Sequence, residues 1–265
     1  MFSLENISLS LHSKNDTAQI LFSAQVAEGT IDDSVAIAYS NLPDIWFSNR
    51  CNLKNVEVSS MLHTINNLLP KGEPPKSENS NINGIKGKAD IACSIKGEGK
   101  NRDVIIKSLK GTFFVAMKSG TVDNSLIVNR LSTAVEKFIK IDNITFQDLS
   151  STCVIARKKF IIQDLKLKSN TGDWRAYGTI GFNSNISLKI KNRLTKPMSQ
   201  QVIKVESGGK SILKGLLRGT RYARTAEKII NNVHIPTDRE GRVTLKLSLE
   251  GTTDNPVAKF NGFSR

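Results

Sequence analysis

The chain has 265 residues, with 38 Lys and Arg against 24 Asp and Glu, which gives a formal net charge of +14. A charge of this size favours anionic partners such as nucleic acid, anionic lipid or an acidic protein, without choosing among them. No stretch approaches the roughly 20 apolar residues of a transmembrane helix, and the opening residues lack the pattern of a signal peptide.

Strands are the first predicted elements. Apolar and polar residues alternate over 2–11, 20–26 and 35–39, which is typical of strands with one apolar and one solvated face. Because the alternation begins at the first residues, we expect the chain to continue a longer upstream sheet. A helix is predicted over 57–69, where apolar residues form one stripe, and Pro70 ends it.

The stretch 71–83 is rich in Pro, Ser, Asn and charge and has no periodicity, which predicts a flexible linker. We therefore expect three parts. Residues 1–70 form a strand block plus a helix, 71–83 form the linker, and 84–265 form a β-rich domain.

The second part again alternates, most clearly at VTLKLSL, residues 243–249. Short turns containing Gly, Asn or Asp join its strands, which favours an antiparallel meander. A second helix is predicted over 124–140. The sequence thus predicts a mainly β fold with a few α-helices, built as an elongated, curled antiparallel sheet. Amphipathic helices would cover part of its half-open groove.

A third helix is predicted within GGKSILKGLLRGTRYARTAEKII, residues 208–230. At 100° per residue its bases fall within an arc of about 120°. Such a helix could contact lipid headgroups, grip nucleic acid, or simply pack on the sheet with its bases solvated. The candidate headgroup or partner contacts are Lys210, Lys214, Arg218, Arg221, Arg224 and Lys228.

The sequence contains few motifs that are typical of enzymes. GGKS ends like a phosphate-binding loop, but the first glycine of that motif would be Lys204. No hydrolase or zinc-protease motif is present, and Asp32 and Asp33 are interpreted as turn residues. We expect no enzymatic activity, no catalytic residues, no metal and no cofactor.

The three cysteines, Cys51, Cys93 and Cys153, lie far apart in the sequence with no histidine near them. This spacing argues against a zinc site. At most one disulfide could form, and we interpret all three as small, half-buried strand or loop residues.

Three pieces of the second part occur in an order that resembles the C-terminal region of the AsmA-like envelope proteins. They are LKGTFFVAMKSGTVDNSLIVNRLS, the run from ITFQDLSS to NISLKI, which contains Gly178 and Gly181, and GRVTLKLSLEGTTDNPVAKF. Together they span 109–260. Two features depart from the family: the usual N-terminal anchor is absent, and residues 157–159 carry bases where a turn glycine is common.

The resemblance implies a bridge-like envelope protein, periplasmic and attached to the inner membrane through an anchor missing from this chain. It implies a role in outer-membrane biogenesis or lipid homeostasis, with phospholipid or another acyl-chain lipid and the membrane surface as partners. The alternative is a structural or adaptor module that binds other envelope proteins, and nucleic-acid binding is a weaker third possibility. The apolar residues expected to line the groove are Phe113, Val115, Met117, Ile180, Phe182, Val243, Leu245 and Leu247.

Overall fold

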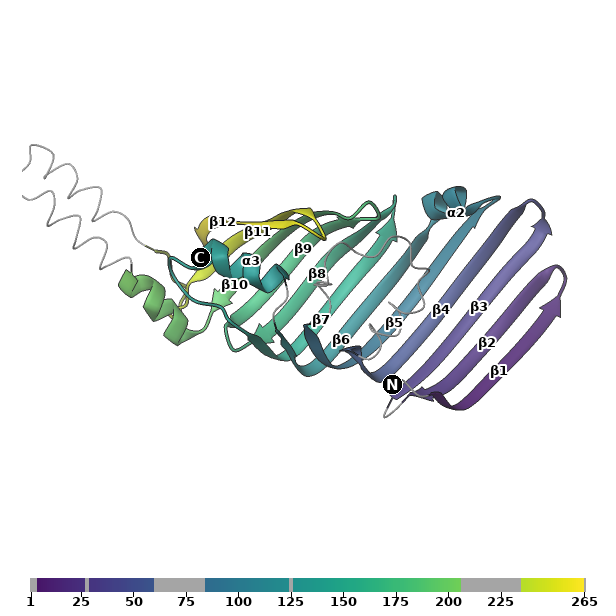
Figure 1. Ribbon diagram of the computed structural model, residues 1–265, viewed down its shortest axis with the longest axis horizontal. Helices are drawn as coiled ribbons and strands as arrows, with labels where there is room; N and C mark the ends of the chain where they lie inside the picture. Colours follow the sequence, from purple (N-terminus) through teal and green to yellow (C-terminus); the bar gives the residue numbers. More distant parts are fainter. Residues whose placement is uncertain (1–3, 27–28, 60–83, 124–125, 206–234, 265) are drawn as a thin grey trace, which may run out of the picture.

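The computed structural model describes residues 4–26, 29–59, 84–123, 126–205 and 235–264. These residues build one antiparallel sheet of twelve strands that lie in chain order, each hydrogen-bonded to its sequence neighbours (Figure 1). The sheet is not closed, because β1 and β12 are its two edges. The predicted mainly β, antiparallel fold is confirmed.

The strands are nine to fifteen residues long. They are β1 (Leu4–Lys14), β2 (Thr17–Val26), β3 (Gly29–Asn41), β4 (Asp44–Glu57), β5 (Ile85–Gly99), β6 (Lys110–Val122), β7 (Ile144–Ala156), β8 (Lys159–Ser169), β9 (Gly172–Gly181), β10 (Asn185–Leu194), β11 (Thr244–Thr252) and β12 (Pro256–Ser264).

Helices interrupt the meander at a few points. Helix α3 (Leu126–Val135) forms within the predicted helix 124–140 and ends earlier, and residues 196–205 are also helical. Of the predicted helix 57–69, Glu57 belongs to β4 and residues 58–59 are helical. Residues 60–69 and the linker 71–83 lie outside the described residues. Strand β4 pairs with β5 along most of its length, so the strands on both sides of 60–83 belong to one sheet.

Helix α2 (Arg102–Ser108) follows β5 and begins at the end of the stretch 97–103, which the sequence pattern assigns to a turn between strands. Its start is fixed by Asn101, whose side-chain oxygen accepts a hydrogen bond from the Val104 amide at 3.1 Å. Asp103 lies in the first turn, where a negative charge is favourable. The chain does bend at residues 100–101, and what the sequence analysis does not predict is the short helix that follows the bend.

The turn between β7 and β8 carries the bases that depart from the AsmA-like pattern. Arg157 and Lys158 have φ values of 52° and 58°, so both residues are left-handed. Two consecutive left-handed residues match the right-handed twist of a hairpin, and glycine or asparagine is the usual choice there. The hairpin therefore forms without the glycine.

The two faces of the sheet can be followed through the strand register, since directly opposite residues share a face. Ile20 of β2 is opposite Val35 of β3, which is opposite Asn49 of β4 and then Ile95 of β5. We call the face that carries these residues the apolar face, and the reverse the polar face. The rows of the apolar face continue across the whole sheet.

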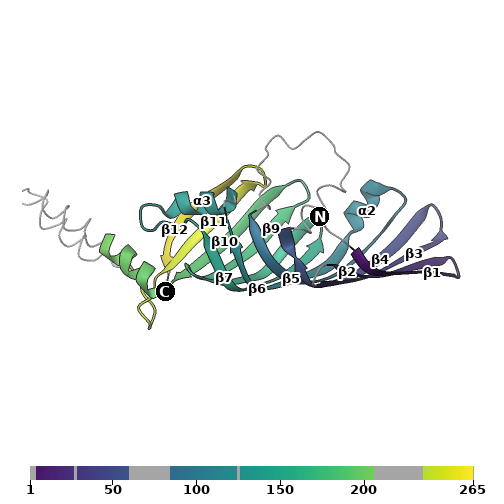
Figure 2. The ribbon, with the colours of Figure 1, turned by 60° about the horizontal axis from the view of Figure 1, so that its bottom comes forward.

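The hydrophobic core lies on the apolar face towards the C-terminal end of the sheet. It is built by strands from β5 onward, by α3 and by residues such as Val202 and Ile235. Helix α3 contributes Val128, Leu131 and Val135, and it lies beside β12 in both views (Figures 1 and 2). From β1–β4 only Leu53 packs against this core.

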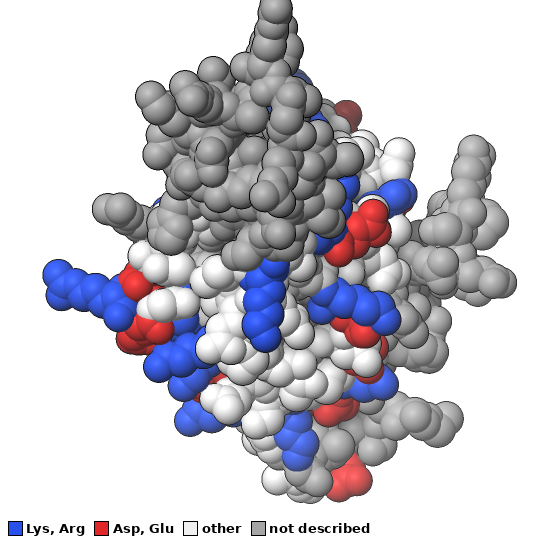
Figure 3. Space-filling model, turned by 90° about the vertical axis from the view of Figure 1, so that its left-hand side faces the viewer, with Lys and Arg blue, Asp and Glu red and all other residues white. Residues whose placement is uncertain are grey.

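A network of ion pairs joins β9 and β10 to residues 238–242, which precede β11. The Arg193 guanidinium contacts Asp238 at 2.5 Å and Glu240 at 3.2 Å, and Arg242 contacts Asp173 at 2.8 Å. Arg242 also donates to the Leu194 carbonyl at 2.6 Å. Basic and acidic side chains lie close together at this end of the molecule (Figure 3).

Acid is expected to weaken this network through Asp238. Hydrogen bonds from the Arg242 backbone and from the Arg193 side chain hold the pKa of Asp238 below its ordinary value. Its stabilising contribution is therefore complete above the unfolded-state pKa of about 3.9 and is lost as the pH falls through the lowered folded-state pKa. We expect Asp238→Asn to lower the melting temperature at pH 7, and its difference from the wild type to shrink as the pH falls towards 2.

The measurement is a series of thermal melts between pH 2 and pH 7. Asp254→Asn is the matched control, because Asp254 is an exposed turn aspartate. The control is expected to follow the wild type at every pH. An Asp238→Asn deficit that persists unchanged at pH 2 would contradict the assignment.

Candidate ligand-binding face of the sheet

The apolar face is exposed at the N-terminal end of the sheet. Leu9 and Leu11 of the edge strand are 68% and 69% exposed, and their cross-strand partners are only half-buried. We call this surface the open half of the apolar face. Its residues are Leu9, Leu11, Ile20, Phe22, Val35 and Ile37.

The open half is the continuation of the core. The row that contains Ile20 and Val35 runs through Ile95 to Ile155, which is 4% exposed, and on to Ile186, which is 6% exposed. The same pattern of side chains is thus buried at one end of the sheet and exposed at the other. Large contiguous apolar surfaces on proteins mark sites that bind another molecule.

Four polar side chains interrupt the apolar face beside the open half. We call Asp33, Asn49, Cys51 and Cys93 the polar cluster. The Asn49 amide donates to the Asp33 carboxylate at 2.6 Å, and the Cys93 thiol donates to the Asn49 amide oxygen at 3.7 Å. The cluster satisfies its own hydrogen bonds, as groups on an apolar surface must.

The polar cluster corrects one interpretation of the sequence. Asp32 and Asp33 lie in the middle of β3, not in a turn, opposite Asn52 and Cys51. Asp33 is tolerated on the apolar face because the Asn49 amide pairs with it. A single sequence does not reveal such a pairing, since Asn49 lies 16 residues further along the chain.

The residues predicted to line a groove fall on the apolar face, but in different surroundings. Phe113, Val115 and Ile180 are half-buried against the core, whereas Met117 is 4% exposed. Val243, Leu245 and Leu247 are fully buried members of the core. Phe182 follows β9 and stacks on Phe160 with ring centroids 5.1 Å apart.

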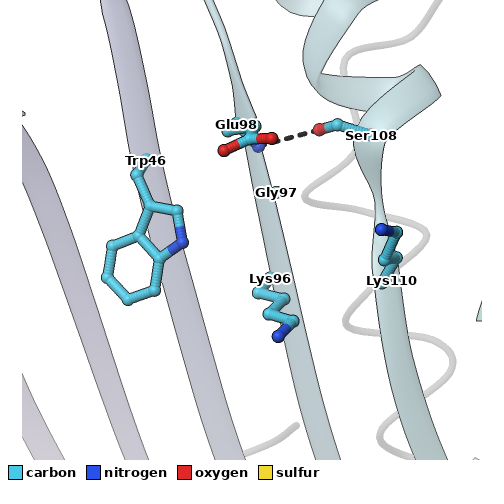
Figure 4. A pocket seen from close by; sticks show the side chains of 6 residues that line it. All are labelled: Trp46, Lys96, Gly97, Glu98, Ser108 and Lys110. Atoms are coloured by element: carbon cyan, nitrogen blue, oxygen red, sulfur yellow. Dashed lines mark hydrogen bonds between the residues drawn. The ribbon is translucent and has the colours of Figure 1, made fainter. Parts of the chain in front are cut away.

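The six predicted contact bases, Lys210 to Lys228, lie outside the described residues. Within the described residues, bases gather on the polar face over β4–β6 (Figure 4). Lys96 and Lys110 are direct cross-strand partners and lie beside Trp46 and Arg50. The Glu98 amide, which donates to Ser108 Oγ at 2.7 Å, closes one side of this depression.

This basic depression is on the opposite side of the sheet from the open half. Trp46 is opposite Ala38, whereas the neighbouring pair Phe47 and Ile37 is on the apolar face. A ligand lying on the open half therefore meets hydrophobic side chains and the polar cluster, and not these lysines. The arrangement is suited to apolar ligands.

The signal for the open half was present in the sequence, in the alternation over 2–39. The predicted groove residues all come from the second part of the chain, because the resemblance to known proteins lies there. Alternation does not show which part of an apolar face is covered by a helix. That depends on the placement of α3 against β12.

Among the described residues, no helix combines the length and the hydropathy that a membrane span needs. Searches with protein-family models, among curated proteins and among solved structures find no match to this chain. Function is therefore inferred from the geometry of the sheet.

Proposed function

We propose that this chain is a non-enzymatic segment of an envelope protein that holds acyl chains of lipid on the open half of the apolar face. One observation carries the proposal. The apolar rows that form the core from β5 onward continue across β1–β3, where Leu9 and Leu11 are exposed and the apolar residues of the open half on β2 and β3 are half-buried. The resemblance to AsmA-like proteins supports it. The proposal places the protein in the periplasm, in lipid homeostasis or outer-membrane biogenesis.

The dimensions of the open half suit an acyl chain. Strands of ten to thirteen residues, as β2 and β3 are, extend for roughly 35–45 Å at about 3.4 Å per residue. The hydrocarbon core of a bilayer is about 30 Å thick and contains two leaflets, so one acyl chain spans about 15 Å. Three strands about 4.8 Å apart are wide enough for more than one chain.

The energetics also favour a nonpolar occupant. Burying apolar surface yields about 25 cal/mol per Å², so a ligand that covers several half-exposed Leu, Ile and Phe side chains gains several kcal/mol. The groups on this face that need solvent or a partner are those of the polar cluster, which already pair with one another. An occupant is therefore not required to satisfy them.

The test uses two neighbouring residues with side chains on opposite faces. Ile20 lies on the open half, and Leu21 lies on the polar face, where it is 38% exposed. The protein is purified without detergent, its bound phospholipid is measured by native mass spectrometry, and a fluorescent fatty acid is titrated. We expect Ile20→Glu to lower lipid occupancy and probe affinity at least tenfold, because acyl chains would bury an unpaired carboxylate.

Leu21→Glu is the matched control and is expected to bind like the wild type. Wild-type protein that carries no phospholipid and does not bind the probe would refute the proposal. If that lipid-free protein instead bound an envelope protein saturably, the adaptor alternative would take its place. Equal losses in both variants would show a general folding defect, and circular dichroism of each variant identifies that case independently.

A further inference from the structure

Two cysteines of the polar cluster meet across neighbouring strands. Cys51 of β4 and Cys93 of β5 are direct cross-strand partners in the antiparallel register, and they share the apolar face. They are separated by 41 intervening residues, 52–92, so the sequence does not bring them together; the sheet does. Both thiols are reduced and half-buried.

The register places the pair within the reach of a disulfide. Directly opposite residues of an antiparallel pair have Cα atoms about 4.5 Å or 5.5 Å apart, depending on the type of pair. Disulfides form at Cα separations of about 4.4–6.8 Å, so either type is compatible. The bond then requires the two Cβ atoms to approach to about 3.8 Å, a small adjustment within a flexible sheet.

The surroundings indicate that the two sulfurs already interact. Burial raises the pKa of the Cys51 thiol to about 12, and the charge of Cys93, the charge of Asp33 and a hydrogen bond with Cys93 add to this effect. The Cys93 thiol also donates to Asn49. The two sulfurs therefore lie beside each other on the apolar face, as the strand register requires.

The third cysteine is excluded from this pairing. Cys153 lies in the same row, but Phe113 of β6 stands between it and Cys93. Two strand spacings of about 4.8 Å separate Cys93 from Cys153 by roughly 10 Å, beyond the range of a disulfide. Cys153 therefore serves as an internal control.

We propose that Cys51 and Cys93 form a reversible disulfide that crosslinks β4 to β5 on the apolar face. The oxidant is a small-molecule or protein disulfide. The thiolate of one cysteine attacks one sulfur of the oxidant and releases the first thiolate. The sulfur of the other cysteine then attacks the cysteine sulfur of the mixed disulfide, losing its proton and releasing the second thiol. The protein loses two protons and two electrons in total, and the external disulfide takes them up to become two thiols. The inference does not depend on lipid binding.

The test equilibrates the purified protein in glutathione buffers of increasing disulfide content. The samples are quenched in acid, alkylated in denaturant and analysed by intact and peptide mass spectrometry. We expect two alkylation sites to disappear together and one crosslinked peptide pair, containing Cys51 and Cys93, to appear. The oxidised form should melt roughly 10 °C above the reduced form, because the bond closes a long loop in the unfolded chain.

Cys153→Ser is expected to form the same crosslink, whereas Cys51→Ser and Cys93→Ser should form no intramolecular crosslink. Three results would overturn the proposal. They are wild-type protein that retains all three alkylation sites at high glutathione disulfide, a crosslink that contains Cys153, and an oxidised form that melts below the reduced one. Circular dichroism first checks that each single variant is folded, and only then is its crosslinking measured.

Discussion

Leu245→Ala is expected to lower the free energy of unfolding by about 2–5 kcal/mol. Leu245 is 0% exposed and lies between Asn192 of β10 and Phe263 of β12, at the centre of the C-terminal core. The strands on both sides limit how far the structure can relax into the space left by the side chain. Urea unfolding monitored by circular dichroism measures the change as a shift in midpoint.

The sheet offers a control of the same residue type. Leu11 faces the same side of the sheet but is 69% exposed on the edge strand. Leu11→Ala is expected to change the free energy of unfolding by no more than about 0.5 kcal/mol. Equal losses in the two variants would show that the core does not lie where the structure places it.

Gly178→Ala is expected to be the most damaging single-methyl change in the described sheet. Gly178 has a φ of +144°, and a Cβ added there would lie 2.1 Å from the Ser187 carbonyl oxygen. That atom belongs to the backbone of the neighbouring strand, so it cannot turn aside as a side chain would. A strained backbone costs about 1–3 kcal/mol, and the collision with β10 adds to it.

A second glycine separates backbone strain from collision. Gly262 also has a positive φ, +102°, but an added Cβ would meet nothing within 4 Å. Gly262→Ala should therefore show the strain alone, and Gly178→Ala should be destabilised by at least a further 1 kcal/mol or so. Urea unfolding of both variants measures the difference. A smaller loss for Gly178→Ala than for Gly262→Ala would contradict the close approach of β9 to β10.

The sequence indicated the strands well, because each has one apolar face and so alternates. Leu245, Leu247 and Leu249 could be assigned to one face in advance, and they share the core. Alternation also marked β2 and β3. What it could not distinguish was a buried face from an exposed one, since Ile20 and Leu247 follow the same pattern. Their burial depends on which elements pack over each region of the sheet.

The sequence predicts the apolar character of the candidate site but not all of the residues that form it. An apolar face that needs a cover follows from alternation, but the polar cluster does not, because the strand register creates it. Asp33, Asn49, Cys51 and Cys93 belong to three different strands, and a slip of one residue between β4 and β5 would put the two thiols on opposite faces. The alkylation experiment on Cys51 and Cys93 therefore tests the register between β4 and β5 directly.

The order of the strands has a consequence for how the sheet is assembled. Each strand pairs only with its neighbours in the chain, so most contacts are between residues a hairpin apart. A hairpin can then be gained or lost without changing how the other strands pair, just as a repeat can be added to a solenoid protein. Loop closure costs most between β4 and β5 and between β10 and β11, where the longest connections must be spanned. Folding should therefore spread outward from three groups of strands, β1–β4, β5–β10 and β11–β12, which join at these two places.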